Sequence, residues 1–422
     1  MTFIANILNK NYKIIFICLL FYGLSISIFL KELNLILFKD LDFHIINIYR
    51  FIIVIFSLYL IFKLKKKINI NLLLYLFIFL LFLYNSLNGQ KFNFEIDPKI
   101  FYRSININYD DIDIFFQNKN KIFVICLLNV FLPVFVFSIC KDFQIEFEKF
   151  KTISLIICNV YLYLLIIFLF YKFIMIKYDI NSLEESFINI HSMIYILNIN
   201  FILIIDKMTT KSKGFNIINL LNISLIIICF FLAETLSHLF ISLISLIFFV
   251  KLFHVNKKYL FFSIIFFSIL ILLSILKVAY IDFQNLDKYF DYNYPGSAIN
   301  SLYVRLLNIK YFLFYTENFN IFTGNNIFID GIYTYPHNIF IDIYVSSGLL
   351  GLLIFIFVVK KTYKNLKKNL NKNNFFIFII LFQSFIFSNL SGFLFTNIIF
   401  NTSLAACLCL LKEKESLIIE NS

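Results

Sequence analysis

Residues 63–88 have the sequence KLKKKININLLLYLFIFLLFLYNSLN, in which four lysines within five residues precede an uncharged run from Ile68 to Asn88. A helix needs about 20 apolar residues to cross the roughly 30 Å hydrocarbon core of a bilayer, and this run is long enough. Because lysine and arginine collect on the cytoplasmic side of membrane helices, the lysine cluster predicts a cytoplasmic start for this helix.

The composition extends this interpretation to the whole chain. Of the 422 residues, 61% are hydrophobic and 15% are charged, whereas soluble globular proteins carry roughly 25% charged residues. This difference excludes an ordinary soluble enzyme. The net charge of +12 does not indicate a nucleic-acid partner, because the lysines lie in the breaks between apolar runs and not on an amphipathic soluble surface.

We predict an all-α polytopic membrane protein of about twelve transmembrane helices, which form a single integral membrane domain over residues 1–422. The expected spans are residues 13–30, 44–62, 68–88, 121–140, 152–173, 188–205, 217–233, 235–253, 259–279, 338–359, 375–395 and 396–411.

The distribution of lysine predicts the orientation. With both termini in the cytoplasm, the cytoplasmic breaks carry 23 lysines against seven acidic residues, as the preference of basic residues for cytoplasmic loops requires. Two long segments then lie outside, the smaller loop 89–120 and the larger loop 280–337. These loops are where the chemistry of the protein is expected.

Arginine is rare enough to be informative, since the chain has 34 lysines but only Arg50, Arg103 and Arg305. Arg305 falls within residues 297–319, whose apolar residues have the spacing of an amphipathic helix lying on the outer membrane surface. Arg103 falls in the smaller loop. Arg50 falls inside a span, where a charge is costly, so we expect it to face the bundle interior or a water-filled cavity.

The start of the tenth span carries the most informative pattern. Pro336 suits the first position of a helix, where its missing N–H has no partner to lose, and this places His337 at the outer end of the span. At 100° per residue, Gly348, Gly351 and Tyr344 lie on the His337 side of the helix. The two glycines predict a notch that admits either a neighbouring helix or an extended lipid chain.

Other polar and sulfur-containing residues are interpreted as structural. Asp342 points away from the His337 side of the tenth span. His238 lies near an outer helix end and is expected to make a buried or interfacial polar contact. The seven cysteines lie in or at the ends of apolar runs and include no CxxC pair, so we expect them to be packing residues.

The order His337-Asn338, nine residues, Gly348, two residues, Gly351 resembles the signature of the O-antigen polymerase and O-antigen ligase superfamily. Twelve spans and a large external loop before the signature also resemble this family over the whole chain. The motif itself covers about residues 305–355.

One further feature resembles the family pattern, and another departs from it. Arg305, followed by an aromatic-rich helix and by Phe322-Thr-Gly324-Asn325, resembles the family's arginine and the glycine turn after it. Many members also carry a Ser-Arg or Thr-Arg step at the outer end of an earlier helix, where this chain has residues 234–238, ETLSH. The role of that arginine is either absent here or borne by Arg50 or Arg103.

The resemblance implies transfer of a glycan from a polyprenyl diphosphate donor to an acceptor hydroxyl at the periplasmic face of the bacterial inner membrane. Arg305 is the expected stabiliser of the departing diphosphate, with Arg103 as second choice, because the guanidinium fork binds phosphate oxygens. His337 is the expected base, since histidine titrates near pH 6.5 and accepts a proton at neutral pH. Asp330 is the alternative base.

The resemblance also indicates the contacts and partners. No cluster of Asp, Glu or His has the spacing of metal ligands, so we expect a metal-independent enzyme without a cofactor. The expected partners are the lipid-linked oligosaccharide donor and acceptor, membrane lipid, a flippase and a chain-length regulator, and no nucleic acid. Substrate contacts are expected at Arg50, Arg103, Gly324, Asn325, Asn338, Tyr344, Gly348 and Gly351.

Three functions remain open at this point. A polymerase would join lipid-linked repeat units, and a ligase would move the finished glycan to lipid A-core. A flippase or transporter for a lipid-linked sugar belongs to a different class and would also suit twelve spans, but we expect internal repeats in such a protein, and the sequence shows none. The polymerase is preferred because the missing arginine step argues against a ligase.

Overall fold

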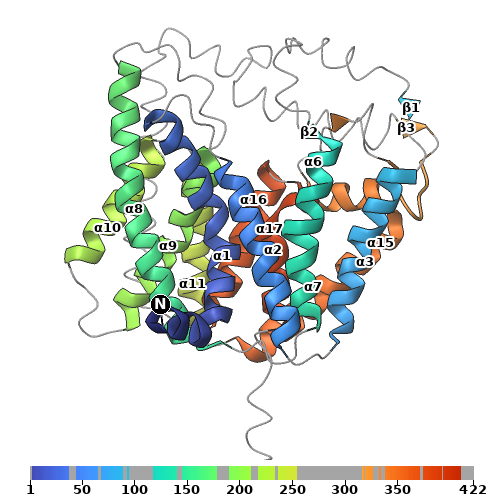
Figure 1. Ribbon diagram of the computed structural model, residues 1–422, viewed down its shortest axis with the longest axis horizontal. Coiled ribbons are helices and arrows are strands. Elements are labelled where there is room, and N and C mark those ends of the chain that lie inside the picture. Colours follow the sequence, from blue (N-terminus) through green and yellow to red (C-terminus); the bar gives the residue numbers. More distant parts are fainter. Residues whose placement is uncertain are drawn as a thin grey trace, which may run out of the picture. The chain divides into compact units, whose positions relative to one another are not determined.

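The computed structural model describes residues 2–37, 44–64, 68–88, 93–94, 117–139, 145–177, 190–210, 217–232, 236–253, 316–317, 319–326, 332–333, 338–370, 374–391 and 393–409. Helices dominate these ranges (Figure 1). The ninth predicted span and the predicted amphipathic helix over residues 297–319 lie almost entirely outside them.

The helices follow the apolar runs of the sequence. Their bounds are α1 Thr2–Leu37, α2 Ile45–Lys63, α3 Ile70–Asn88, α6 Lys119–Val124, α7 Leu132–Ile139, α8 Phe147–Lys177, α9 Ile190–Thr210, α10 Ile217–Leu232, α11 Leu236–Phe253, α15 Ile339–Asn369, α16 Phe375–Ser391 and α17 Ile398–Cys409. A π-helical turn, η1 (Ile125–Phe131), joins α6 to α7, and a 3₁₀ turn, η3 (Leu394–Thr396), lies between α16 and α17.

Six helical segments within the described ranges are long and apolar enough to cross a membrane. They are Asn11–Asn34, Ile45–Lys63, Ile70–Asn88, Ile122–Ile139, Phe147–Tyr171 and Ile339–Asn369. Three shorter apolar helices of 10–17 residues lie in α10, α16 and α17. The predicted all-α, multi-pass membrane architecture is therefore confirmed, while the count of twelve spans remains a prediction.

The chain forms two compact units that alternate along the sequence. Unit 1 contains residues 1–59, 143–277 and 369–384, and unit 2 contains residues 60–142, 278–368 and 385–422. Unit 1 therefore holds α1, α8, α9, α10 and α11, whereas unit 2 holds α3, α7, α15 and α17.

Polar side chains tie the helices of unit 1 together. Asn198 of α9 lies at the centre, with Nδ2 2.7 Å from His238 Nδ1 and Oδ1 accepting the Ser242 hydroxyl at 2.7 Å. The Asn198 carbonyl accepts Gln383 Nε2 at 3.2 Å. His238 is fully buried and stacks on the ring of Phe230. These contacts confirm the interpretation of His238 as a buried polar contact.

The π-helical turn of unit 2 has a local cause. Pro133 follows it closely and cannot donate a hydrogen bond to the carbonyl four residues earlier. The Leu132 N–H bonds instead to the carbonyl of Leu127, five residues back. Local π-helical adjustments are one way in which membrane helices accommodate the gap that a proline leaves in the helical ladder.

Two short antiparallel pairings join the two loops that the sequence predicts to be outside. β1 (Asn93–Phe94) pairs with β3 (Thr316–Glu317), and β2 (Gln117–Asn118) pairs with β4 (Ile332–Tyr333). Both pairings belong to unit 2. The described parts of segments 89–120 and 280–337 are therefore in contact with each other.

The ion pair between Lys151 of α8 and Asp206 of α9 provides a test of the packing in unit 1. Lys151 Nζ and Asp206 Oδ2 are 2.7 Å apart, and both side chains are nearly buried. The Lys151 ammonium also lies over the Phe375 ring. Removing one partner leaves a buried charge, which costs about 3–5 kcal/mol. Asp206→Ala should therefore destabilise the purified protein strongly in thermal melts. Lys151→Met combined with Asp206→Leu should recover much of that loss, and a double variant as unstable as the summed single variants would contradict this pairing.

Candidate functional site

The tenth predicted span is not a continuous helix. Within α15, Gly348 has φ 65° and ψ −166°, a backbone conformation essentially restricted to glycine. The helix therefore consists of a first half, residues 339–347, and a second half, residues 349–369. A projection at 100° per residue assumes an unbroken helix, so it cannot be carried past Gly348 to Gly351. His337 lies outside the described residues, and the placement of both glycines on its side remains a prediction.

A turn formed by residues 319–326 fills the break. The Leu349 and Leu350 N–H groups, which open the second half of α15, donate to the carbonyls of Ile321 and Phe322 at 2.7 and 3.1 Å. The Asn325 N–H donates to the Val345 carbonyl of the first half at 3.0 Å. Helix ends leave such groups without intrahelical partners, and the turn satisfies both ends of the break.

The contact is so close that only glycine fits at two positions. Gly324 has φ 77°, and a Cβ placed there would lie 2.5 Å from the Ser347 nitrogen. A Cβ on Gly348 would overlap the backbone of Phe322 and Thr323. We call this reciprocal contact between the 319–326 turn and the break at Gly348 the glycine interlock. The backbone of the turn thus occupies the space beside Gly348, which the sequence had suggested for a helix or a lipid chain.

Helix α3 completes the interlock. Asn85 Nδ2 donates to the Thr323 carbonyl of the turn and, at 2.9 Å, to the Ser346 carbonyl of α15. The Ser347 hydroxyl donates to the Ile78 carbonyl at 3.3 Å. Asn85 was missed by the sequence analysis, although an asparagine near the end of an apolar run, followed by Ser86, was the one available signal.

Two of the predicted contact residues are used to build this region. Asn325 is buried, and its Oδ1 accepts the Asn320 N–H at 2.7 Å, which closes the turn. Asn338 caps α15, since its Oδ1 accepts the N–H groups of Phe340 and Ile341 at 3.0 and 3.2 Å. The cap determines where α15 begins, two residues after His337.

The remaining predicted residues divide into three groups. Tyr344 is half-buried and packs against the ring of Phe319, 4.9 Å between centroids. Arg50 belongs to unit 1, is half-buried, and donates from Nη1 to Asn47 Oδ1 at 3.1 Å. His337, Arg305, Asp330 and Arg103 lie outside the described residues.

Asp342 is a buried carboxylate in the first half of α15 that the sequence analysis did not select. Its Oδ2 accepts the Leu394 N–H at 3.3 Å, while its Oδ1 has no hydrogen-bond partner among the described residues. The nearby Asn389 side chain accepts the Ile339 N–H at 3.3 Å. These contacts hold the first half of α15 against the end of α16 and the start of η3. Among the described residues, no group of three His, Cys, Asp or Glu side chains could hold a metal ion.

Comparison of the chain with protein-family models, with curated proteins and with solved structures gives no match.

The glycine interlock predicts that alanine is not tolerated at either of its glycines. Gly348→Ala and Gly324→Ala should each lower the free energy of unfolding by more than about 1–2 kcal/mol, the cost of left-handed backbone alone, because steric overlap adds to it. Thermal unfolding of the purified protein measures the effect. Leu349→Ala keeps the same backbone N–H and changes a partly exposed side chain, so it serves as the control. Equal melting temperatures for Gly348→Ala and Leu349→Ala would argue against the interlock.

Proposed function

We propose that this protein is an O-antigen polymerase, which joins polyprenyl-diphosphate-linked oligosaccharide repeat units at the periplasmic face of the bacterial inner membrane. The observation that carries the proposal is the glycine interlock. The resemblance rests on two separate pieces of sequence, the glycine turn at Gly324 and the signature from His337 to Gly351, and these pieces pack directly on each other.

The loop pairings support the same proposal. Arg103 lies in the chain between β1 and β2, and Asp330 lies in the chain between β3 and β4. Pairing of β1 with β3 and of β2 with β4 ties these two loop segments to each other at both ends. In a site built from both loops, Arg103 would come from the smaller loop and Asp330 from the larger loop.

The proposed reaction is a direct displacement. The oxygen of an acceptor sugar hydroxyl attacks the anomeric carbon of the donor, the bond from that carbon to the diphosphate oxygen breaks, and the configuration inverts. The hydroxyl proton passes to His337, with Asp330 as the alternative acceptor. Arg305 stabilises the negative charge that develops on the polyprenyl diphosphate as it leaves, with Arg103 or Arg50 as further phosphate or sugar contacts.

The interlock also offers a place for the lipid part of the substrate. Ile321 and Phe322 of the turn are 54% and 70% exposed, and Leu349 and Leu350 beside them are also exposed. Together these side chains form an apolar surface directly over the break in α15. A polyprenyl chain lying on this surface would bring its diphosphate toward the chain segment that precedes α15.

The broken helix favours a second candidate, a flippase or transporter for a lipid-linked sugar, because such proteins often bind substrate through the free backbone groups of discontinuous helices. In α15, however, the N–H groups of Leu349 and Leu350 are already bonded to the 319–326 turn. These two N–H groups are therefore not available to bind a substrate. This is why the enzyme is the preferred proposal. A ligase, which would use the same loop design, is the other enzyme candidate.

The first test concerns the proposed chemistry. Arg305→Lys should lose most activity although the charge is kept, because lysine cannot present a bidentate fork to the diphosphate. His337→Ala should also be inactive but still inserted at a normal level in the membrane. The measurement is complementation of a deletion strain, with expression checked by immunoblot. Full complementation by Arg305→Ala, or normal glycan from His337→Ala, would remove these roles.

The second test separates the three functions by the point at which the pathway stops. Loss of a polymerase should leave surface lipopolysaccharide capped by a single repeat unit, because the ligase still transfers unpolymerised units. Loss of a ligase should leave lipopolysaccharide bare while long glycan accumulates on the polyprenyl carrier. Loss of a flippase should leave it bare with single units on the carrier. Gel separation of lipopolysaccharide and mass analysis of the carrier should give the single-unit cap, and long carrier-linked chains would refute the polymerase.

A further inference from the structure

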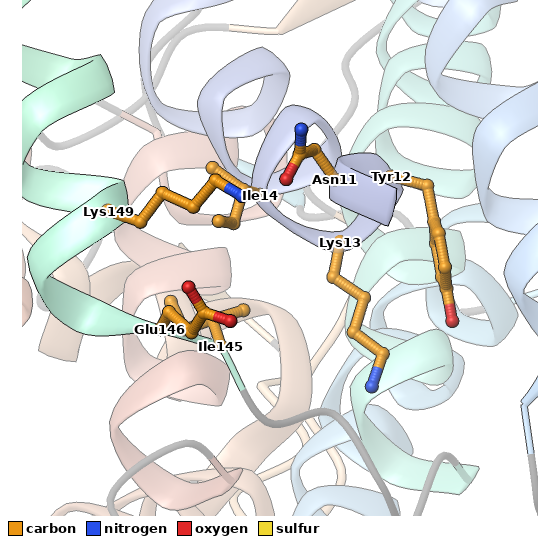
Figure 2. Close-up of a pocket in the computed structure, with 7 residues that line it drawn as sticks. All are labelled: Asn11, Tyr12, Lys13, Ile14, Ile145, Glu146 and Lys149. Atoms are coloured by element: carbon orange, nitrogen blue, oxygen red, sulfur yellow. The ribbon is translucent and has the colours of Figure 1, made fainter. Parts of the chain in front are cut away.

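A pocket of about 230 Å³ lies in unit 1, between the part of α1 where its apolar run begins and the start of α8. It is lined by residues 11–14 of α1 and by Ile145, Glu146 and Lys149 at the start of α8 (Figure 2). Figure 2 shows the Lys149 side chain extending from α8 toward Ile14 of α1, with Glu146 on the same side of the pocket. None of these residues has a place in the proposed glycan transfer.

The pocket lies at the membrane boundary. The apolar part of α1 begins at Asn11 and that of α8 begins at Phe147, so both spans start at the pocket and enter the membrane from the same face. The positions of Lys13 and Lys149 at these starts indicate the cytoplasmic face.

The lining combines groups that can bind a phosphate with one carboxylate that can accept a hydrogen bond. Lys13 and Lys149 contribute two positive charges against the single negative charge of Glu146, and the Asn11 amide adds a neutral donor. Lysine ammonium groups pair with phosphate as point charges. Basic pockets between transmembrane helices on the cytoplasmic side are a recognised form of lipid headgroup site.

The surface of α8 below the pocket suits the acyl chains of such a lipid. Ile156, Val160 and Ile167 follow Lys149 by 7, 11 and 18 residues, which places them within about 20° of Lys149 on the helix. Their exposed fractions are 58%, 54% and 66%. An apolar stripe therefore runs into the membrane from the same side of α8 that carries Lys149.

We propose that this pocket binds the headgroup of a phospholipid. Lys13 and Lys149 pair with the phosphodiester, Glu146 accepts a hydrogen bond from the ammonium or hydroxyl group at the end of the headgroup, and the acyl chains lie along the apolar stripe of α8. The bound lipid bridges α1 and α8 at the cytoplasmic face. This site is independent of the proposed glycan transfer and would remain if that function were wrong.

The test is a lipid titration of the full-length protein, purified and delipidated in detergent, followed by native mass spectrometry. Phosphatidylethanolamine and phosphatidylglycerol should bind more tightly than phosphatidylcholine, whose headgroup has no donor for Glu146, and Glu146→Gln should reduce this preference. Lys13→Gln combined with Lys149→Gln should weaken binding about 30-fold, on the basis of about 1 kcal/mol for each lysine. Lys360→Gln combined with Lys364→Gln removes the same charge from exposed positions on α15 and should leave binding unchanged.

Charge-preserving variants separate binding from folding. Lys13→Arg with Lys149→Arg should retain the affinity of the wild-type protein, and loss of binding in this variant would count against the charge pairing. Equal affinity of the wild type and the double glutamine variant would overturn the site. Inorganic phosphate at millimolar concentration should not displace the lipid. Displacement, or phosphate binding with no preference among the three lipids, would identify a soluble phosphate ligand and refute the phospholipid.

Discussion

The structure depends on one constraint, that backbone polar groups in an apolar environment must find hydrogen-bond partners within the protein. An unsatisfied N–H or C=O in hydrocarbon costs several kcal/mol. The break at Gly348 exposes such groups on both sides, and the 319–326 turn satisfies them through Ile321, Phe322 and Asn325. A loop segment is thereby held against a transmembrane helix at a defined position, and the start of α15 at Asn338 is held with it.

Polar side chains serve the same purpose elsewhere in unit 2. Asn85 bridges the turn and α15, and the Tyr75 hydroxyl of α3 donates to Asn401 of α17. The buried Asp342 receives the Leu394 N–H. Apolar surface gives little preference for one helix arrangement over another in lipid, so packing and interhelical hydrogen bonds decide it. Asparagine and serine in these spans therefore contribute to the specificity of the fold and not only to its polarity.

Hydropathy and charge were sufficient to predict the membrane class and most helices, because a long uncharged run has few alternatives. The position of His238 near the end of an apolar run was also sufficient to predict a buried or interfacial polar contact. The break in α15 could not be predicted, since Val345-Ser-Ser-Gly348-Leu349 continues a helical pattern without a proline. The reason for the break is a partner 24 residues earlier in the chain, Gly324, and no local pattern reports such a contact. The contact of Asp342 with Leu394 could not be predicted for the same reason.

The glycine interlock is the central claim, and disulfide cross-linking tests it directly. Ile321 and Leu349 are exposed and joined by a backbone hydrogen bond of 2.7 Å, which places their Cα atoms within reach of a disulfide. With the seven native cysteines replaced, Ile321→Cys paired with Leu349→Cys should cross-link rapidly on mild oxidation in membranes. Ile321→Cys paired with Leu353→Cys, one turn further along α15, should cross-link slowly. Equal rates for the two pairs, or no cross-link in the first, would contradict the interlock.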